Sequence, residues 1–229
     1  MQLKAIVSYD DTLNDHDALM LGQLLADAGA ELTLAYVRHT TQDERQREEL
    51  EEHEAEALLE RGARWLGDLD VERRVIVSAS TGEGLKRLAE DEDADIVVFG
   101  SDYRTAAGHV APQQSAQTLL EGGPAAVAIA PANYRSDRSP RIGTVGVLAA
   151  PGDDAAIETA RELAESLGAR VTRDERHVDL LVVGSRIEAT ESRVMITAQA
   201  QNEIDNSTCP VLVVPRGVSL RFAPALAVS

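Results

Sequence analysis

The chain alternates between short apolar runs rich in Val, Ile and Leu and longer stretches with apolar residues three or four positions apart. This alternation is typical of a parallel β-sheet covered by helices. Expected strands are 4–10, 30–39, 71–79, 94–100, 125–131, 142–150, 169–173, 177–185 and 209–215. Expected helices are 16–29 with Gly29 as C-cap, 42–66, 82–93, about 115–121, 153–168 and one between the last two strands.

The pattern runs through the chain twice. "ADIVVFGS" at 94–101 is similar to "VDLLVVGS" at 178–185, and "AAVAIAPA" at 125–132 to "CPVLVVPR" at 209–216, which indicates an internal duplication. The second copy has no counterpart of the helix–strand–helix segment at about 42–92. We expect a complete domain at 1–134, a linker at 135–140, a truncated domain at 141–218 and a C-terminal tail at 219–229.

Composition narrows the function classes. Hydrophobic residues make up 44% and aromatic residues 3%, so we expect a soluble domain with an aliphatic core. A net charge of −17 argues against a nucleic acid or an anionic membrane as partner. The single cysteine, Cys209, excludes an internal disulfide. No apolar run approaches a membrane span and the N-terminus lacks a signal-peptide pattern, so we expect a cytoplasmic protein.

Three stretches carry a family resemblance: "AIVSYDDT" at 5–12, "STGEGLKRLAEDEDADIVVFGS" at 80–101 and "CPVLVVPRG" at 209–217. With the glycine-serine loop that follows position 100, they make the chain resemble the universal stress protein (UspA-like) family. The resemblance implies an α/β fold of two Rossmann-like, adenine nucleotide alpha hydrolase-like units in tandem. A pseudo-twofold axis would relate them, the second unit being truncated.

The resemblance also implies a phosphate-binding loop: Gly, two residues, Gly, nine residues, then Gly-Ser or Gly-Thr. Glycines let backbone N–H groups approach phosphate oxygens, and the next helix N-terminus adds partial positive charge. Here Gly100 matches the first position, but Tyr103 stands at the second and Gln113-Gln114 at the last pair. The sequence therefore predicts a loop that keeps its shape and loses affinity for phosphate.

On the nucleoside side, Asp10 matches a family contact to ribose or adenine, and Val37 a position whose backbone contacts adenine. Asp10 is equally compatible with an N-cap or turn role. Within the loop, Arg104 or His109 could supply charge to an anion. Alternatively, His109 is an exposed loop residue without a role. The Tyr103 ring could instead fill the phosphate pocket. The full candidate set is Asp10, Val37, Gly100, Ser101, Gly108, His109 and Ser115, with ATP or AMP as the ligand that the resemblance implies.

The second copy departs further from the family's nucleotide-binding pattern. Ala149, Ala150 and Pro151 replace the strand-end Asp, Ile187 the second glycine, and Thr197-Ala198 the final pair. We expect no nucleotide there. We expect the second copy to cover the exposed edge of the first, as an intramolecular pseudo-dimer of the two closing strands. A homodimer of whole chains stays open.

Two functions remain in contest. One is a non-catalytic stress-response regulator or scaffold with a degenerate site in the first domain and an unidentified regulatory protein partner. The alternative is an ATP- or AMP-binding regulator, with slow ATP hydrolysis at most. The chain shows no GxSxG elbow and no reactive cysteine. Asp15, His16 and Asp17 favour capping and solvated surface over a metal cluster, so we expect neither catalytic residues nor metal ligands.

Overall fold

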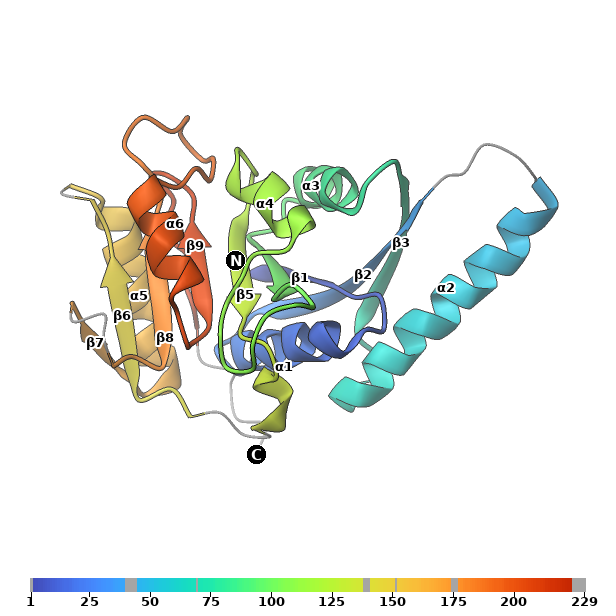
Figure 1. Cartoon of the computed structure of the whole chain (residues 1–229), viewed down its shortest axis with the longest axis horizontal. Helices are drawn as coiled ribbons and strands as arrows, with labels where there is room; N and C mark the ends of the chain where they lie inside the picture. Colours follow the sequence, from blue (N-terminus) through green and yellow to red (C-terminus); the bar gives the residue numbers. More distant parts are fainter. Residues whose placement is uncertain are drawn as a thin grey trace.

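The computed structural model describes residues 2–39, 45–68, 70–137, 141–150, 152–173 and 177–223. The strands within these residues join one sheet in the order β3-β2-β1-β4-β5-β9-β8-β6-β7, with helices on both faces (Figure 1). The strands are β1 Lys4–Ser8, β2 Glu31–His39, β3 Glu72–Ser78, β4 Ile96–Gly100, β5 Ala126–Ala130, β6 Thr144–Leu148, β7 Arg170–Thr172, β8 Leu180–Gly184 and β9 Val211–Val214. The helices are α1 Leu13–Asp27, α2 Arg45–Leu66, α3 Thr81–Asp91, α4 Gln114–Leu120, α5 Asp154–Leu167 and α6 Ala198–Asp205, with a 3-10 turn, η1, at Tyr134–Ser136.

Two hydrophobic cores lie on opposite faces of the sheet. One is built from α1, α2 and α5 against residues such as Val7 and Val145, and the other from α3, α4 and α6 against Ile6 and Val183. Alternate residues of each strand point to opposite faces, so the central strands β4, β5 and β9, which are buried along their whole length, must be apolar on both faces. That is why these strands read as apolar runs in the sequence.

The antiparallel pairing of β5 with β9 joins the two repeats. β5 pairs with β9 in a register that places Ala128 opposite Leu212, and these two residues are equivalent in the duplicated sequence. The backbone N–H of Val110 donates to Ser207 O, and that of its equivalent, Val194, to Gly123 O. Such reciprocity is the mark of a twofold axis, here a pseudo-twofold within one chain. The expected pairing of the closing strands is confirmed.

The truncation leaves β7 at the end of the sheet. In the first repeat β2 pairs with both β1 and β3, whereas β7 pairs with β6 alone. Where the first repeat carries α3, Val178 lies over Gly146, so close that a Cβ on the glycine would come within 2.9 Å of its side chain. A local side chain thus takes over part of the cover of a missing helix.

Helix α1 differs from its predicted bounds at both ends. It begins three residues earlier than predicted, at Leu13, because Thr12 is the N-cap and forms a capping box with Asp15. Its C-cap is Ala28, not Gly29. Gly29 follows with φ of +100°, a conformation that favours glycine.

The start of the predicted linker is fixed in place. Asp17 is fully buried and accepts hydrogen bonds from the N–H groups of Asn133 and Arg135 and from the Arg135 guanidinium at 2.9 Å. The expectation that Asp17 lies on a solvated surface is wrong.

The start of the predicted C-terminal tail also packs against the fold. The Leu220 N–H donates to Thr159 Oγ1 of α5, and Phe222 packs into the first core. Within the described residues no helix is both long and apolar enough to cross a membrane.

Candidate functional site

The carboxyl ends of β1 and β4 converge beside the start of α1. The strand order reverses between them, since β1 connects onward to β2 and β4 to β5 on the other side. Ligands of open α/β sheets bind at such a switch point. Asp10 follows β1 and Gly100 ends β4, so the structure brings these two predicted residues to the two sides of one crevice.

Asp10 is exposed, and its carboxylate has no hydrogen-bond partner among the described residues. Its backbone N–H donates to Asp15 Oδ2 at 3.0 Å. Although Asp10 is exposed, the surrounding protein partly desolvates its carboxylate, which raises its pKa above the ordinary aspartate value; the charge of Asp15 adds to this, and His39 acts in the opposite direction. Asp10 is not the N-cap, which is Thr12, so its side chain is free to receive a ligand hydroxyl.

Val37 lies in β2, opposite Ile76 of β3. Its side chain is buried and touches α3, where a Cβ on Gly84 would approach Val37 Cγ1 to 2.9 Å. The Tyr9 N–H, just after β1, donates a backbone hydrogen bond to Ala35 O of β2. Ala35 lies two residues before Val37. The backbone of Val37 therefore lies beyond the β1–β2 pairing.

Gly100 is required by packing. A Cβ at this position would come within 2.0 Å of the Asn14 carbonyl oxygen in the first turn of α1. The Asn14 side chain in turn donates from Nδ2 to Ser101 O at 2.6 Å. The helix start thus occupies the space next to Gly100 and covers one of the loop carbonyls. No pattern in the sequence indicated this contact.

Ser101 is buried and its hydroxyl is engaged within the loop. It donates to Ala130 O at 2.7 Å and accepts from the Ala111 N–H at 3.2 Å. These contacts close the two ends of the loop onto the last residue of β5. The predicted ligand contact of Ser101 would have to come from its backbone.

The rest of the loop uses its amides internally. The N–H of Gly108 donates to Ala132 O at 2.7 Å, and Gly108 has φ of +80° with open space where a Cβ would lie. The His109 side chain is exposed. Seven backbone N–H groups between positions 102 and 111 donate to protein acceptors: those of Asp102, Arg104, Thr105, Gly108, His109, Val110 and Ala111.

Tyr103 and Arg104 pair with each other on the surface of the loop. Tyr103 is 73% exposed, and its hydroxyl accepts from Arg104 Nε at 2.7 Å while the guanidinium lies over its ring. The expectation that the Tyr103 ring fills the phosphate pocket is therefore wrong. Arg104 is exposed, and its Nε is engaged by the hydroxyl of its neighbour.

Helix α4 begins at Gln114, one residue before the predicted start. Its N-cap is Gln113, whose side chain makes no capping hydrogen bond. Ser115 lies partly buried in the first turn, and its hydroxyl has no hydrogen-bond partner among the described residues. Two bulky amides thus occupy the positions where the family loop would have Gly and Ser or Thr.

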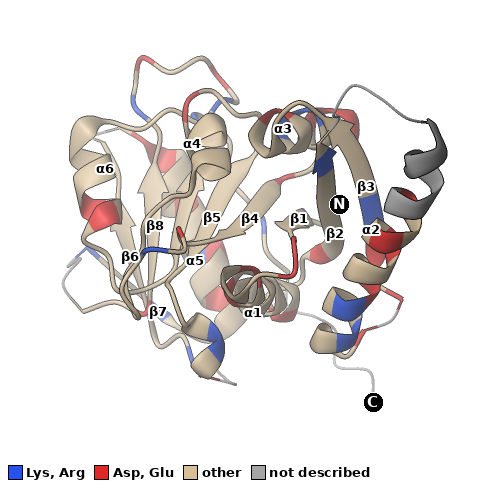
Figure 2. Ribbon diagram, turned by 45° about the vertical axis from the view of Figure 1, so that its right-hand side comes forward, with Lys and Arg blue, Asp and Glu red and all other residues tan. Residues whose placement is uncertain are grey.

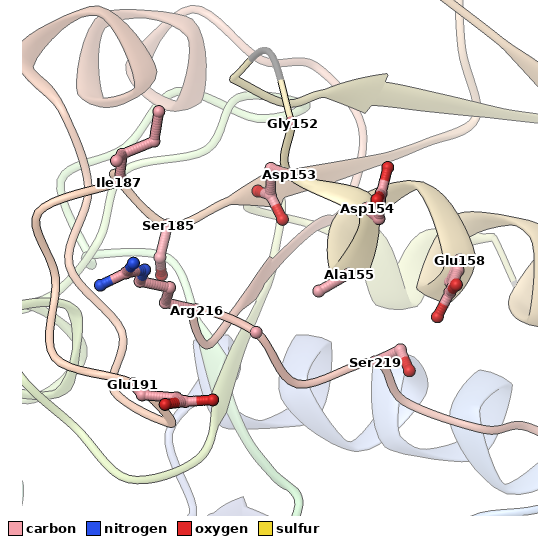
Figure 3. A pocket seen from close by; sticks show the side chains of 11 residues that line it. Gly152, Asp153, Asp154, Ala155, Glu158, Ser185, Ile187, Glu191, Arg216 and Ser219 are labelled. Atoms are coloured by element: carbon pink, nitrogen blue, oxygen red, sulfur yellow. The ribbon is translucent and has the colours of Figure 1, made fainter.

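The second repeat has a cavity of about 480 Å³ at the corresponding strand ends. Figure 3 shows its side chains, with Asp153 from the start of α5, Ser185 from the loop after β8 and Arg216 from the segment after β9. Ser185 repeats the role of Ser101, donating to Val214 O. Asp153 Oδ2 is buried without a partner, and burial raises the pKa of this carboxyl. Four carboxylates line the cavity against one arginine: Asp153, Asp154, Glu158 and Glu191.

A polar network that sequence reasoning missed supports the β1 end. Tyr9 is buried and donates its hydroxyl to Asp11 Oδ1, while Arg61 Nε donates to Asp11 Oδ2 at 2.6 Å. His16 stacks on Trp65, with ring centroids 5.4 Å apart. These residues lock α1 to α2. Within the described part of the chain, no group of three or more His, Cys, Asp or Glu is arranged to hold a metal ion.

Comparisons with known proteins identify the fold and the family of this chain. A search of curated proteins found no match. A universal stress protein from Archaeoglobus fulgidus DSM 4304 has a similar fold, with 15% identity over 93% of this chain and 98% of that chain and a TM-score of 0.68. So has a functionally unknown protein from Pseudomonas aeruginosa PAO1, with 14% identity over 94% and 93% and a TM-score of 0.59.

A universal stress protein solved in complex with cAMP is 22% identical over 43% of this chain and 76% of that chain, with a TM-score of 0.37. The decisive match is to a family model. The model described as "Universal stress protein family" matches residues 2–131 and 172–215, which is most of the chain and includes β1–β5 of the first repeat and β8 and β9 of the second. The protein belongs to the universal stress protein family.

Proposed function

We propose that this protein is a non-catalytic stress-response regulator or scaffold. Its adenine-nucleotide site is degenerate in the first repeat and absent from the second. The observation that carries the proposal is the fate of the loop amides after β4, seven of which donate to acceptors inside the protein. A loop whose N–H groups are already engaged has few left to bind phosphate oxygens.

The expected loss of affinity for a triphosphate follows from the phosphate contacts that the loop lacks. A hydrogen bond to a charged group contributes about 1.5–3 kcal/mol. On the family loop pattern, Tyr103 and Gln113 replace two glycines, and the loss of both phosphate contacts would weaken triphosphate binding by roughly two to four powers of ten. The net charge of −17 acts in the same direction, because it repels a polyanion. Figure 2 shows acidic residues on α2, α3 and α6, in both repeats.

The second repeat is the less favourable of the two. Its strand-end cavity has four carboxylates and one arginine, and the Arg216 guanidinium already donates to Ala189 O at 2.6 Å. A phosphate chain in this cavity would face like charges at close range. We therefore infer that the second repeat completes the fold and binds no nucleotide.

A second candidate function is supported by Asp10. Its exposed, unpartnered carboxylate is suited to accept hydrogen bonds from the two hydroxyls of a ribose. Adenosine or AMP needs fewer phosphate contacts than ATP, so the loss of loop amides affects such a ligand less. An AMP-responsive regulator that uses Asp10 and the Val37 backbone is thus the alternative.

Catalysis has little support among the described residues. The Ser101 and Ser185 hydroxyls are both engaged with backbone carbonyls. Cys209 is partly buried, and burial raises the pKa of its thiol, which disfavours the reactive thiolate. The output would then pass through an unidentified protein partner. Whether whole chains also pair is a separate question for sedimentation velocity.

Calorimetric titration of the full chain with ATP, AMP and cAMP tests these functions. The scaffold function predicts no saturable heat for ATP. Saturable binding of AMP that is lost in Asp10→Ala would favour the alternative. Asp91→Ala, which removes an exposed carboxylate at the end of α3, is the matched control and should behave as the parent chain. Tight ATP binding abolished only by Asp10→Ala would overturn the scaffold function.

A further inference from the structure

A cavity of about 470 Å³ lies at the junction of the two repeats. It is lined from the first repeat by the end of α4 and from the second by the loop after β8 and the start of α6. It shares no lining residue with the strand-end cavity of Figure 3. Its lining residues are Gln117, Leu120, Glu121, Arg186, Met195, Ile196, Thr197, Ala198 and Gln201. It is therefore a property of the paired repeats.

Arg186 is the unusual member of this lining. Its Nε is buried without a hydrogen-bond partner, and the guanidinium has no ion pair among the described residues. Its equivalent in the first repeat is Asp102, whose carboxylate accepts the Arg104 N–H. A buried donor without an acceptor is unfavourable, so the arrangement needs an explanation that the fold does not supply.

The surroundings of Arg186 suit a small anion. Ala198 and Gln199 are the first residues of α6, where backbone N–H groups have no partner within the helix. Thr197 caps only the Ala200 N–H, at 3.0 Å. The helix start thus adds partial positive charge next to an unpaired guanidinium. Leu120, Met195 and Ile196 provide an apolar wall on which a hydrocarbon body could pack.

The charge of Glu121 favours a monoanion over a dianion in this cavity. Glu121 is exposed, lines the same cavity and lies beyond ion-pair distance of Arg186, since none is found between them. Its charge opposes a dianion such as phosphate more than a monoanion. The guanidinium fork matches the two oxygens of a carboxylate.

From this arrangement we propose that the inter-repeat cavity binds a small organic monocarboxylate, with its carboxylate on Arg186 and its apolar part against Leu120 and Ile196. The site does not depend on the strand-end crevice. It would let a small metabolite report to both repeats at once, because α4 and α6 belong to different copies.

The test uses the full chain with butyrate, butyramide and inorganic phosphate as probes. We expect butyrate to shift the Arg186 Nε–H resonance with saturation and to raise the melting temperature. Butyramide should do neither, and phosphate should bind at least tenfold more weakly than butyrate. Shifts that do not saturate, or phosphate binding as tight as butyrate binding, would overturn the proposal.

Two variants separate binding from folding. Arg186→Met removes the unpartnered donor, so the chain without butyrate should melt no lower than the parent, yet butyrate should no longer raise its melting temperature. Arg161→Gln changes an exposed arginine of α5 and should leave the butyrate response intact. An unchanged response in Arg186→Met, measured directly by calorimetry, would exclude this cavity as the site.

Discussion

The hydroxyls of Ser101 and Ser185 make the same bond in the two repeats, each donating at 2.7 Å to a backbone carbonyl 29 residues further along the chain. Each also accepts an N–H from the residue ten positions on, Ala111 or Met195. The second repeat has lost three elements of the first and kept this bond. The glycine-serine loop is therefore preserved by a folding requirement that acts whether or not a ligand binds.

Replacing either serine should destabilise the fold. Ser101→Ala leaves the Ala130 carbonyl and the Ala111 N–H without a partner in a buried setting, and we expect a loss of about 1–3 kcal/mol in the free energy of unfolding. Ser185→Ala should cost a similar amount. Urea unfolding measures both, with Ser115→Ala as the control. A Ser101→Ala chain as stable as the parent would mean that water replaces the hydroxyl.

Gly100→Ala should be destabilising without any ligand present. The new methyl group meets the Asn14 carbonyl oxygen at 2.0 Å, and backbone cannot move aside cheaply. We expect a loss of about 1–3 kcal/mol or more. Gly108→Ala meets no atom within 4 Å and should lose only about 1 kcal/mol, from its positive φ. Equal losses in thermal unfolding would contradict the packing role of Gly100.

Arg135→Met should leave the buried Asp17 carboxylate without its counter-ion. Breaking a buried pair by removing one partner costs about 3 kcal/mol or more. The matched control is Arg64→Met, which removes the exposed pair with Glu60 on α2 and should cost no more than about 1 kcal/mol. Unfolding by guanidinium chloride compares the two variants. A small loss in Arg135→Met would show that the two backbone N–H groups suffice for Asp17.

Leu212→Ala tests the junction of the repeats. Leu212 is 1% exposed and faces Ala128 across the antiparallel pairing, so the deletion opens a cavity next to the pseudo-twofold axis. We expect a loss of about 2–5 kcal/mol in the free energy of unfolding. Leu13→Ala, at a position 65% exposed, should change it by less than about 0.5 kcal/mol. A loss in Leu212→Ala no larger than that in Leu13→Ala would contradict a packing role for Leu212 at the junction.

Asp10→Asn should be relatively more stabilising at pH 7 than at pH 4. Burial and the charge of Asp15 raise the folded-state pKa of Asp10 above its unfolded value. Ionising Asp10 therefore opposes folding, an effect that is absent below the unfolded pKa and complete above the folded one. The measurement is the difference in unfolding free energy between variant and parent across this range. A difference that does not vary with pH would indicate an unperturbed Asp10.

The sequence by itself determined the architecture. Unbroken apolar runs predict strands buried on both faces, and the duplication at 94–101 and 178–185 predicts two copies of one unit. These patterns are local or repetitive, so they survive without knowledge of contacts. For the same reason, the sequence shows that the second copy has no counterpart of the segment at about 42–92.

Only the tertiary structure decided which polar groups are free. The sequence places Ser101 and Gly108 in one loop, but their hydrogen bonds reach Ala130 and Ala132, outside the loop. The burial of Asp17 by Arg135 depends on a contact between residues 118 positions apart. Likewise, Arg186 became a candidate because α4 of the other repeat closes its cavity. Hydrogen-bond satisfaction is a property of three-dimensional neighbours, and periodicity along the chain carries no record of them.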